Sequence, residues 1–153
     1  ENYNWGYNEL EKFFNEELKG KMPAAVFDSK YNFISSFQSK SLEQAKAGGL
    51  EPYSALIIYD DAIHNIPQLW ILDRQQIYHG WPVVRAEDYL GLPSKNFFKT
   101  RYFIRPTNGV PLKRLGEYSA SSDLIEQDLI VQKINPTVLK NKRGEDVFKI
   151  YKF

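Results

Sequence analysis

The stretch 54-SALIIYDDAIHNIPQLWILDRQQIYHGWPVVRA-86 decides the fold of this chain. It opens with residues 55–59, a short apolar run with β-branched members, which predicts a strand buried on both faces. Helical spacing then predicts a helix that runs to about His79, and Gly80 is the residue expected to end it. A second short apolar run, residues 81–84, follows the glycine. The stretch is therefore expected to form a strand, a helix and a second strand.

Asp73 stands out within this predicted helix. On a helical wheel it falls in the middle of the apolar face, so we expect its carboxylate to be buried and to need a partner. Arg74 follows directly, but it points roughly 100° away around the helix. The partner of Asp73 is therefore expected on another element.

Composition bounds the class of protein. The chain has 153 residues, 42% of them hydrophobic and 25% charged, which is typical of one globular domain with a core of its own. A net charge of +1 gives no electrostatic case for nucleic acid as a partner. Cysteine is absent, which excludes disulfides and thiol chemistry. The sequence contains no apolar run of the length that a membrane span needs.

Helical and strand patterns alternate through the first two thirds of the chain, and strand patterns dominate afterwards. A capping-box-like pair, Asn8 with Glu11, predicts the start of a first helix that ends at Gly20. The further expected elements are strands at 24–27, 100–104, 129–134 and 147–153 and short helices at 41–47, 86–90 and 119–127. This order favours a single α/β layered domain, with a mostly parallel sheet, flanking helices and an antiparallel C-terminal edge.

Three aspartates follow two of the predicted strands: Asp28, Asp60 and Asp61. Ligands of open α/β sheets gather at the carboxyl ends of strands, and Mg²⁺ prefers carboxylate oxygens. A divalent metal is therefore the one cofactor that we consider for this chain. Aspartate also commonly ends strands and opens turns, and we favour that simpler interpretation, with no cofactor.

A polar and aromatic cluster closes the central stretch, and it comprises Asp73, Arg74, Tyr78, His79 and Trp81. As a substrate-binding site it would offer aromatic faces to a sugar and a guanidinium to an anion. As a structural feature it would be a buried salt-bridge network that holds the helix on the sheet. We favour the structural interpretation and keep the binding site as the functional hypothesis.

Basic residues gather in the second half of the chain, namely Lys95, Lys99, Arg101, Arg105, Lys113 and Arg114. They could meet acidic lipid headgroups. Acidic residues elsewhere balance them, so we expect a solvated face instead.

Three segments together resemble a known family. Residues 5–18, WGYNELEKFFNEEL, are similar to the helix that follows the last membrane span in polytopic, lipid-linked-sugar-dependent glycosyltransferases of the dolichyl-phosphate-mannose and aminoarabinose transferase-like superfamily. Residues 69–74 (LWILDR) with residues 78–83 (YHGWPV) resemble that superfamily's "L-W-x-L-x-R…Y-H-G-x-P" region. Residues 146–151, DVFKIY, resemble the last strand of its C-terminal domain. About half of the chain is covered, and residues 95–127 are not.

The resemblance implies a soluble extracytoplasmic domain, excised from a longer membrane protein and tethered to the membrane through it. The partners it implies are the membrane-embedded remainder of that protein and a lipid-linked sugar or glycan acceptor. The parent would move a sugar from a polyprenyl-phosphate carrier to an acceptor. The family's catalytic acid belongs to an early loop outside this chain. The domain itself would therefore be non-catalytic and would assist the binding of acceptor or substrate.

Two alternative functions remain beside the glycosyltransferase interpretation. One is a stand-alone magnesium-dependent phosphohydrolase that uses Asp28, Asp60 and Asp61. The other is a carbohydrate-binding or protein-binding module whose surface is made of exposed aromatic side chains, with Tyr3, Trp5, Tyr31 and Trp81 as candidates.

Overall fold

A five-stranded mixed sheet forms the centre of the molecule. The computed structural model describes residues 6–23, 43–44, 46–60, 66–92, 98–107 and 120–153. The strand order is β4-β3-β5-β7-β6, and the strands are β3 (Ala55–Tyr59), β4 (Val83–Arg85), β5 (Thr100–Pro106), β6 (Thr137–Lys140) and β7 (Asp146–Lys152). Strand β3 pairs in parallel with β4 and β5, whereas β7 pairs antiparallel with β5 and β6. The predicted α/β fold with an antiparallel C-terminal edge is confirmed.

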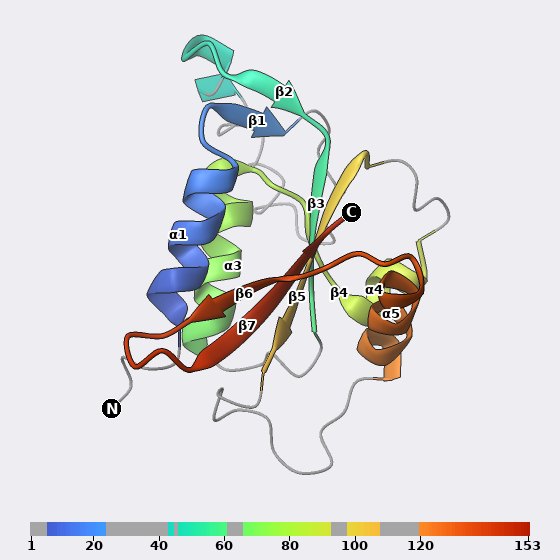
Figure 1. The fold of residues 1–153 in the computed structure, drawn as a ribbon. Helices are drawn as coiled ribbons and strands as arrows, with labels where there is room; N and C mark the ends of the chain where they lie inside the picture. The colour runs from blue at the N-terminus through green and yellow to red at the C-terminus, as the bar shows by residue number, and fades with distance from the viewer. Residues whose placement is uncertain (1–5, 24–42, 45, 61–65, 93–97, 108–119) are drawn as a thin grey trace.

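Helices cover both faces of this sheet, so the domain has three layers (Figure 1). On one face lie α1 (Tyr7–Glu17) and α3 (Ile66–His79), which contact each other. On the other face lie α4 (Ala86–Leu90) and α5 (Ala120–Val131), which also contact each other. This arrangement gives the chain two apolar cores, one on each side of the sheet.

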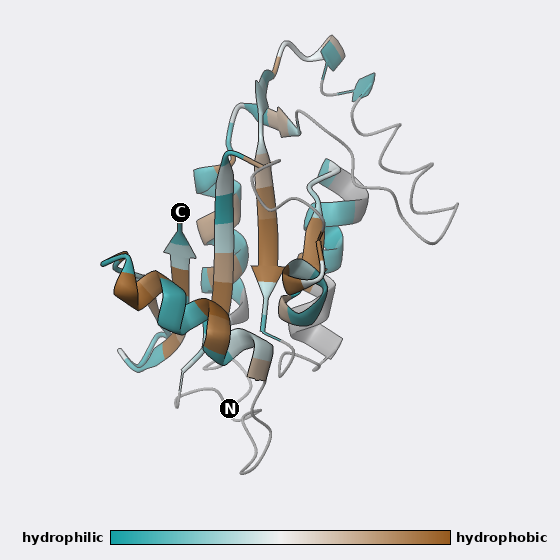
Figure 2. Ribbon diagram, turned by 90° about the vertical axis from the view of Figure 1, so that its right-hand side faces the viewer, coloured by the Kyte–Doolittle hydropathy of each residue, from teal (hydrophilic) through white to brown (hydrophobic). Residues whose placement is uncertain are grey.

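Successive side chains of strand β3 point alternately into the two cores. Ala55 and Ile57 face the core under α1 and α3, while Leu56 and Ile58 face the core under α4 and α5. All four side chains are almost fully buried, and Figure 2 shows this central strand brown along most of its length. A strand buried on both faces is the expected form for a parallel strand between two helical layers, and the sequence prediction for residues 55–59 is confirmed.

A second, two-stranded parallel sheet lies beyond the amino end of β3 (Figure 1). It pairs β1 (Lys21–Pro23) with β2 (Glu51–Tyr53), which leads directly into β3. The first strand predicted from sequence, residues 24–27, lies outside the described residues. Of the predicted helix at 41–47, residues 43–44 and 46–47 are helical, and a turn at Gly48 and Gly49 follows as expected.

Two predictions near the ends of helices are wrong. Residues 129–134 were expected to form a strand, but α5 continues to Val131, and the edge strand that pairs with β7 is β6 instead. The turn predicted at 141–144 does lie between β6 and β7. At the other end of the chain, Asn8 lies inside α1, and no side chain caps that helix.

The N-cap of α1 is Gly6, whose backbone takes a left-handed conformation with φ of 80°. A β-carbon at this position would lie 2.3 Å from Val147 Cγ2, far inside van der Waals contact. Residue 6 therefore has to be glycine both for its backbone and for its packing against β7.

We expect Gly6→Ala to lower the free energy of unfolding by more than about 1 kcal/mol, because alanine is strained at positive φ and also collides with Val147. Gly20→Ala is the matched control, since Gly20 has φ of 76° but nothing within 4 Å of the added carbon. Urea unfolding of both variants measures the difference. Equal losses would show that the Val147 contact contributes nothing.

In the part of the chain that the structure describes, no helix combines the length and the apolar character that crossing a bilayer requires.

Candidate ligand-binding cleft

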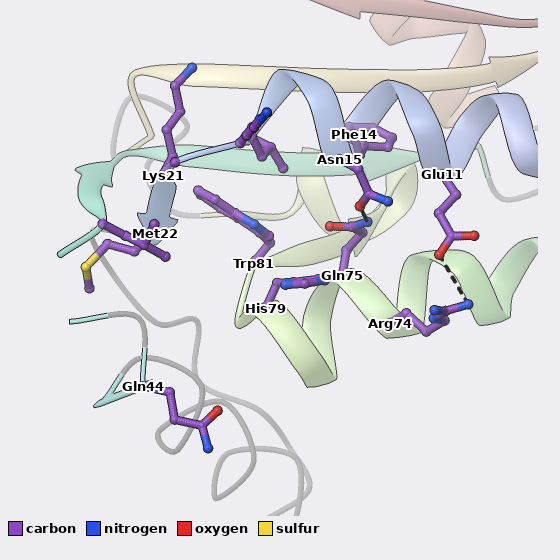
Figure 3. A pocket seen from close by; sticks show the side chains of 14 residues that line it. Glu11, Phe14, Asn15, Lys21, Met22, Gln44, Arg74, Gln75, His79 and Trp81 are labelled. Atoms are coloured by element: carbon purple, nitrogen blue, oxygen red, sulfur yellow. Dashed lines mark hydrogen bonds and ion pairs between the residues drawn. The ribbon is translucent and has the colours of Figure 1, made fainter. Parts of the chain in front are cut away.

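A cleft of about 540 Å³ lies between the C-terminal ends of α1 and α3, beside the small β1–β2 sheet. Its apolar wall is formed by Phe14, Leu18, Met22 and Trp81. Polar groups on its walls include the amides of Asn15, Gln44 and Gln75. Figure 3 shows these side chains around the cavity. The volume is within the range of about 300–1,000 Å³ that is typical of small-molecule sites.

Trp81 is placed by the turn that ends α3. Gly80 takes a left-handed conformation with φ of 76°, and its N–H donates to the carbonyl of Gln76 at 3.0 Å. The chain thus turns back toward the sheet, and the indole of Trp81 packs edge-to-face on Tyr53, with ring centroids 6.2 Å apart. Only 2% of Trp81 is exposed, so its predicted role as an exposed aromatic is wrong. Tyr3, Trp5 and Tyr31 lie outside the described residues.

Gln75 is a polar side chain held almost entirely inside the protein. It is 3% exposed, and its Nε2 donates to Asn15 Oδ1 across the gap between α3 and α1, at 3.3 Å. Its Oε1 has no protein partner among the described residues, and Figure 3 shows this oxygen turned toward the Trp81 side of the cleft. The cleft therefore contains one fixed hydrogen-bond acceptor.

Two opposite charges at the rim of the cleft pair with each other. Arg74 Nη1 lies 3.1 Å from Glu11 Oε1, which joins α3 to α1 by an ion pair. Next to this pair, desolvation and the guanidinium of Arg74 lower the pKa of His79, although Glu11 acts in the opposite direction. Together these effects favour the neutral form of the His79 imidazole.

The lysine at the opposite end of the cleft points away from it. Lys21 Nζ donates to the carbonyl oxygen of Glu17 at the end of α1, at 3.2 Å, and it lies 4.2 Å from the centroid of the Tyr53 ring. Figure 3 shows the side chain directed away from Trp81. Its charge thus stabilises the C-terminus of the helix dipole and does not line the cavity floor.

Hydrogen bonds behind the cleft fix β2 against the sheet and α1. The hydroxyls of Tyr53 and Tyr102 are 3.1 Å apart, and Tyr102 donates to Glu17 Oε1 at 3.3 Å. Lys152 Nζ, from β7, donates to the same carboxylate oxygen at 2.6 Å. This network makes the wall of the cleft part of the folded core.

The structure brings together three of the five residues that sequence suggested for substrate binding, because Arg74, His79 and Trp81 all line the cleft. Asp73 does not line it and is exposed, so the expected buried carboxylate is wrong. Partial desolvation nevertheless raises the pKa of Asp73. The side chain of Tyr78 lies outside the described part of α3.

Gln75 and Asn15 were not among the residues predicted to form the site. Glutamine and asparagine side chains usually face solvent, so neither residue carried a signal of its own. The neighbouring α1 covers the side of α3 that carries Gln75, and its Asn15 supplies the partner. The signal that could have found Gln75 is the small number of polar residues in α3, because a mostly apolar helix is covered on several sides and its few polar side chains can then be buried.

The carboxyl ends of β3 and β5 are the other place where an α/β sheet commonly binds ligands. Here ion pairs occupy it. Asp60 is 1% exposed, and its Oδ2 lies 3.1 Å from Nε of Arg105, which is 5% exposed. Arg105 also pairs with Asp123 and, at 2.7 Å, with Glu126. Arg105 thus does not belong to a solvated basic face, contrary to the sequence interpretation; Lys95, Lys113 and Arg114 lie outside the described residues.

The predicted metal site is not supported by the residues that can be described. Asp28 and Asp61 lie outside them, and Asp60 is committed to Arg105. Within the described ranges no group of three histidine, cysteine, aspartate or glutamate side chains is arranged to hold a metal ion.

Glu126 joins this ion-pair cluster to β7. Burial raises the pKa of its carboxyl, but hydrogen bonds from Lys149 Nζ at 2.6 Å and from the Tyr151 hydroxyl outweigh burial, and the pKa is lowered overall. A carboxyl whose pKa is lower in the folded state stabilises the fold above its unfolded pKa of about 4.3, and this stabilisation is lost as pH falls through the folded value.

We therefore expect the free energy of unfolding to fall as pH decreases below about 4.3, with part of the slope due to Glu126. Urea unfolding at a series of pH values measures the slope, and Glu126→Gln should reduce it. An unchanged slope in Glu126→Gln would show that Lys149 and Tyr151 do not hold this carboxylate in the ionised form.

No family model matches the chain, and comparison with curated proteins and with solved structures finds no match either.

Proposed function

We propose that this chain is the extracytoplasmic domain of a membrane glycosyltransferase, which moves a sugar from a polyprenyl-phosphate carrier to an acceptor. In this proposal the domain is tethered at the outer face of the membrane through its parent protein. It performs no chemistry itself and binds part of the acceptor or substrate in the cleft between α1 and α3.

One observation carries the binding role. The segments that resemble the glycosyltransferase superfamily, around residues 5–18, 69–74 and 78–83, contribute α1, α3 and Trp81, and these elements form the cleft. Segments far apart in the sequence thus meet around one cavity that has an apolar wall and a fixed polar group. Such a cavity is the default candidate for a binding site.

A free-standing carbohydrate-binding or protein-binding module is the second candidate, and the same cleft favours it. Among the described residues nothing favours the phosphohydrolase alternative, because Asp60 is buried in an ion pair with Arg105.

A kinetic experiment on the full-length protein tests the proposal. Membranes that contain it are assayed for sugar transfer from a polyprenyl-phosphate donor to acceptor, with Gln75→Met compared with Gln76→Met, a neighbouring glutamine that does not line the cleft. We expect Gln75→Met to raise KM for the substrate bound in the cleft and to leave kcat unchanged, because the reaction centre lies elsewhere. Absence of transfer, or a loss confined to kcat, would contradict the proposal.

A further inference from the structure

We infer that Tyr53 is a nucleophilic tyrosine, a covalent modification site whose phenolic oxygen attacks activated sulfonyl and acyl groups. Tyr53 is partly exposed, whereas Tyr89, Tyr102 and Tyr151 are at most 5% exposed. Of the tyrosines whose side chains are described, Tyr59 is the other one that is partly exposed. A reagent in solution can therefore reach Tyr53, and the groups around its hydroxyl decide how reactive the oxygen is.

Two lysine ammonium groups from different strands create a positive field at Tyr53. Lys21 Nζ, from β1, lies 4.2 Å from the centroid of the Tyr53 ring. Lys152 Nζ, from β7, lies 5.8 Å from the centroid of the Tyr102 ring, and the Tyr102 hydroxyl is 3.1 Å from that of Tyr53. One carboxylate, Glu17, faces these two cations and accepts a hydrogen bond from Lys152 at 2.6 Å. A phenolate at Tyr53 therefore forms in a site with excess positive charge, which favours the charged form.

The hydroxyl of Tyr102 can stabilise the phenolate directly. Its oxygen lies between the hydroxyl of Tyr53 and Glu17 Oε1, to which it donates at 3.3 Å. A phenol has one hydrogen, so Tyr102 donates to one of these neighbours at a time. When Tyr53 loses its proton, this hydrogen can turn to the Tyr53 oxygen, while Lys152 still neutralises Glu17. Burial raises the pKa of Tyr102, so it remains a protonated donor.

The balance of these effects favours ionisation of Tyr53. Burial by itself raises the pKa of Tyr53, but hydrogen bonds with the side chains of Thr100 and Tyr102 and the charges of Lys152 and Lys21 outweigh burial, and the pKa is lowered overall. More phenolate is therefore present at a given pH than in an ordinary tyrosine. The phenolate is the nucleophilic form, so its fraction sets the rate of reaction.

An arylsulfonyl fluoride is the probe for this reaction. The Tyr53 hydroxyl first gives its proton to the buffer, and the phenolate oxygen then attacks the sulfur atom. The O–S bond forms, the S–F bond breaks and fluoride leaves. A sulfonate ester remains on Tyr53 and adds a fixed mass to the peptide that contains it.

The test labels the 153-residue chain with this probe at pH 8, both in buffer and in urea that unfolds the chain, and locates the adducts by mass spectrometry of peptides. In the unfolded chain the tyrosines have their ordinary reactivity. We expect Tyr53 to react several-fold faster in the folded chain than in the unfolded chain, and faster than Tyr59. A Tyr53 that reacts no faster when folded would overturn the inference.

Two lysines of β7 provide matched variants, since each donates to a carboxylate at 2.6 Å. Lys152→Met should slow the labelling of Tyr53 several-fold, because the phenolate loses a nearby cation. Lys149→Met should leave it unchanged, because Lys149 bonds Glu126 of α5, on the opposite face of the sheet. The side chain of Lys152 is about half exposed, so the fold tolerates its replacement. Urea unfolding of both variants confirms that they are folded.

Tyr102→Phe tests the hydrogen bond separately from the charges. It removes the hydroxyl and keeps the buried ring, so we expect slower labelling of Tyr53 in a folded chain. Equal labelling of Tyr53 in the parent, Tyr102→Phe and Lys152→Met chains would show that these neighbours do not activate Tyr53, and it would overturn the inference.

Discussion

Replacing Arg105 with alanine is expected to lower the free energy of unfolding by about 3–5 kcal/mol, the cost of leaving a buried charge without its partner. Arg105 is 5% exposed, and its guanidinium contacts the carboxylates of Asp60, Asp123 and Glu126. The loss of the guanidinium would cost most at the carboxylate of Asp60, because Asp60 is 1% exposed. Urea unfolding of the variant and the parent chain at pH 7 measures the loss.

The matched control is Arg85→Ala, which removes an arginine from an ion pair with Asp88 whose two side chains are both about half exposed. Exposed pairs contribute about 0–1 kcal/mol, so this variant should be nearly as stable as the parent. The double variant Asp60→Asn with Arg105→Met should recover part of the loss, because no charge remains unpaired at Asp60. Equal stability of the Arg105 and Arg85 variants would contradict the buried cluster.

Trp81→Ala is expected to destabilise the fold by a similar amount, about 3–5 kcal/mol, because it removes a large buried side chain and leaves a cavity. Trp81 is 2% exposed and belongs to the core beneath α1 and α3. The substitution also removes the edge-to-face contact between the Trp81 indole and the Tyr53 ring. Thermal or urea unfolding of the variant measures the effect.

Trp81→Phe is the control, since a smaller aromatic ring keeps part of the packing, and we expect it to lose clearly less stability than Trp81→Ala. A Trp81→Ala chain that unfolds like the parent would place this side chain on the surface and would reopen the exposed-aromatic module. The expected loss also means that Trp81→Ala is a poor test of binding, which is why the cleft is probed through Gln75.

The layered α/β fold followed from sequence because its central elements have strong local signals. Residues 55–59 are apolar without interruption, and Gly80 marks the end of α3, as the left-handed turn there requires. Local sequence patterns gave wrong predictions where tertiary contacts determine the secondary structure. The β-branched run after Leu129 looked like a strand, yet Ile125 and Leu129 are buried against the sheet as helical neighbours, while Ile130 and Val131 remain exposed.

Only part of the candidate site could be predicted, because local patterns identify neighbours in sequence but not partners from other elements. Arg74, His79 and Trp81 are close in sequence, so a motif could point to them. The partners of Arg74 and of the neighbouring Gln75 come from α1, in Glu11 and Asn15 respectively, and only the packing of α1 against α3 brings these side chains together. The burial of Asp60 and Arg105 likewise depends on the pairing of β3 with β5, which no local pattern in either segment specifies.

The most direct test of the central claim is to read the genomic frame upstream of Glu1 and to count its apolar spans. If the proposed function is right, this frame encodes a series of membrane spans of about 20 residues each, with an acidic residue in the first extracytoplasmic loop. A start codon, or a lone signal peptide, immediately before Glu1 would contradict it and would leave a free-standing binding module.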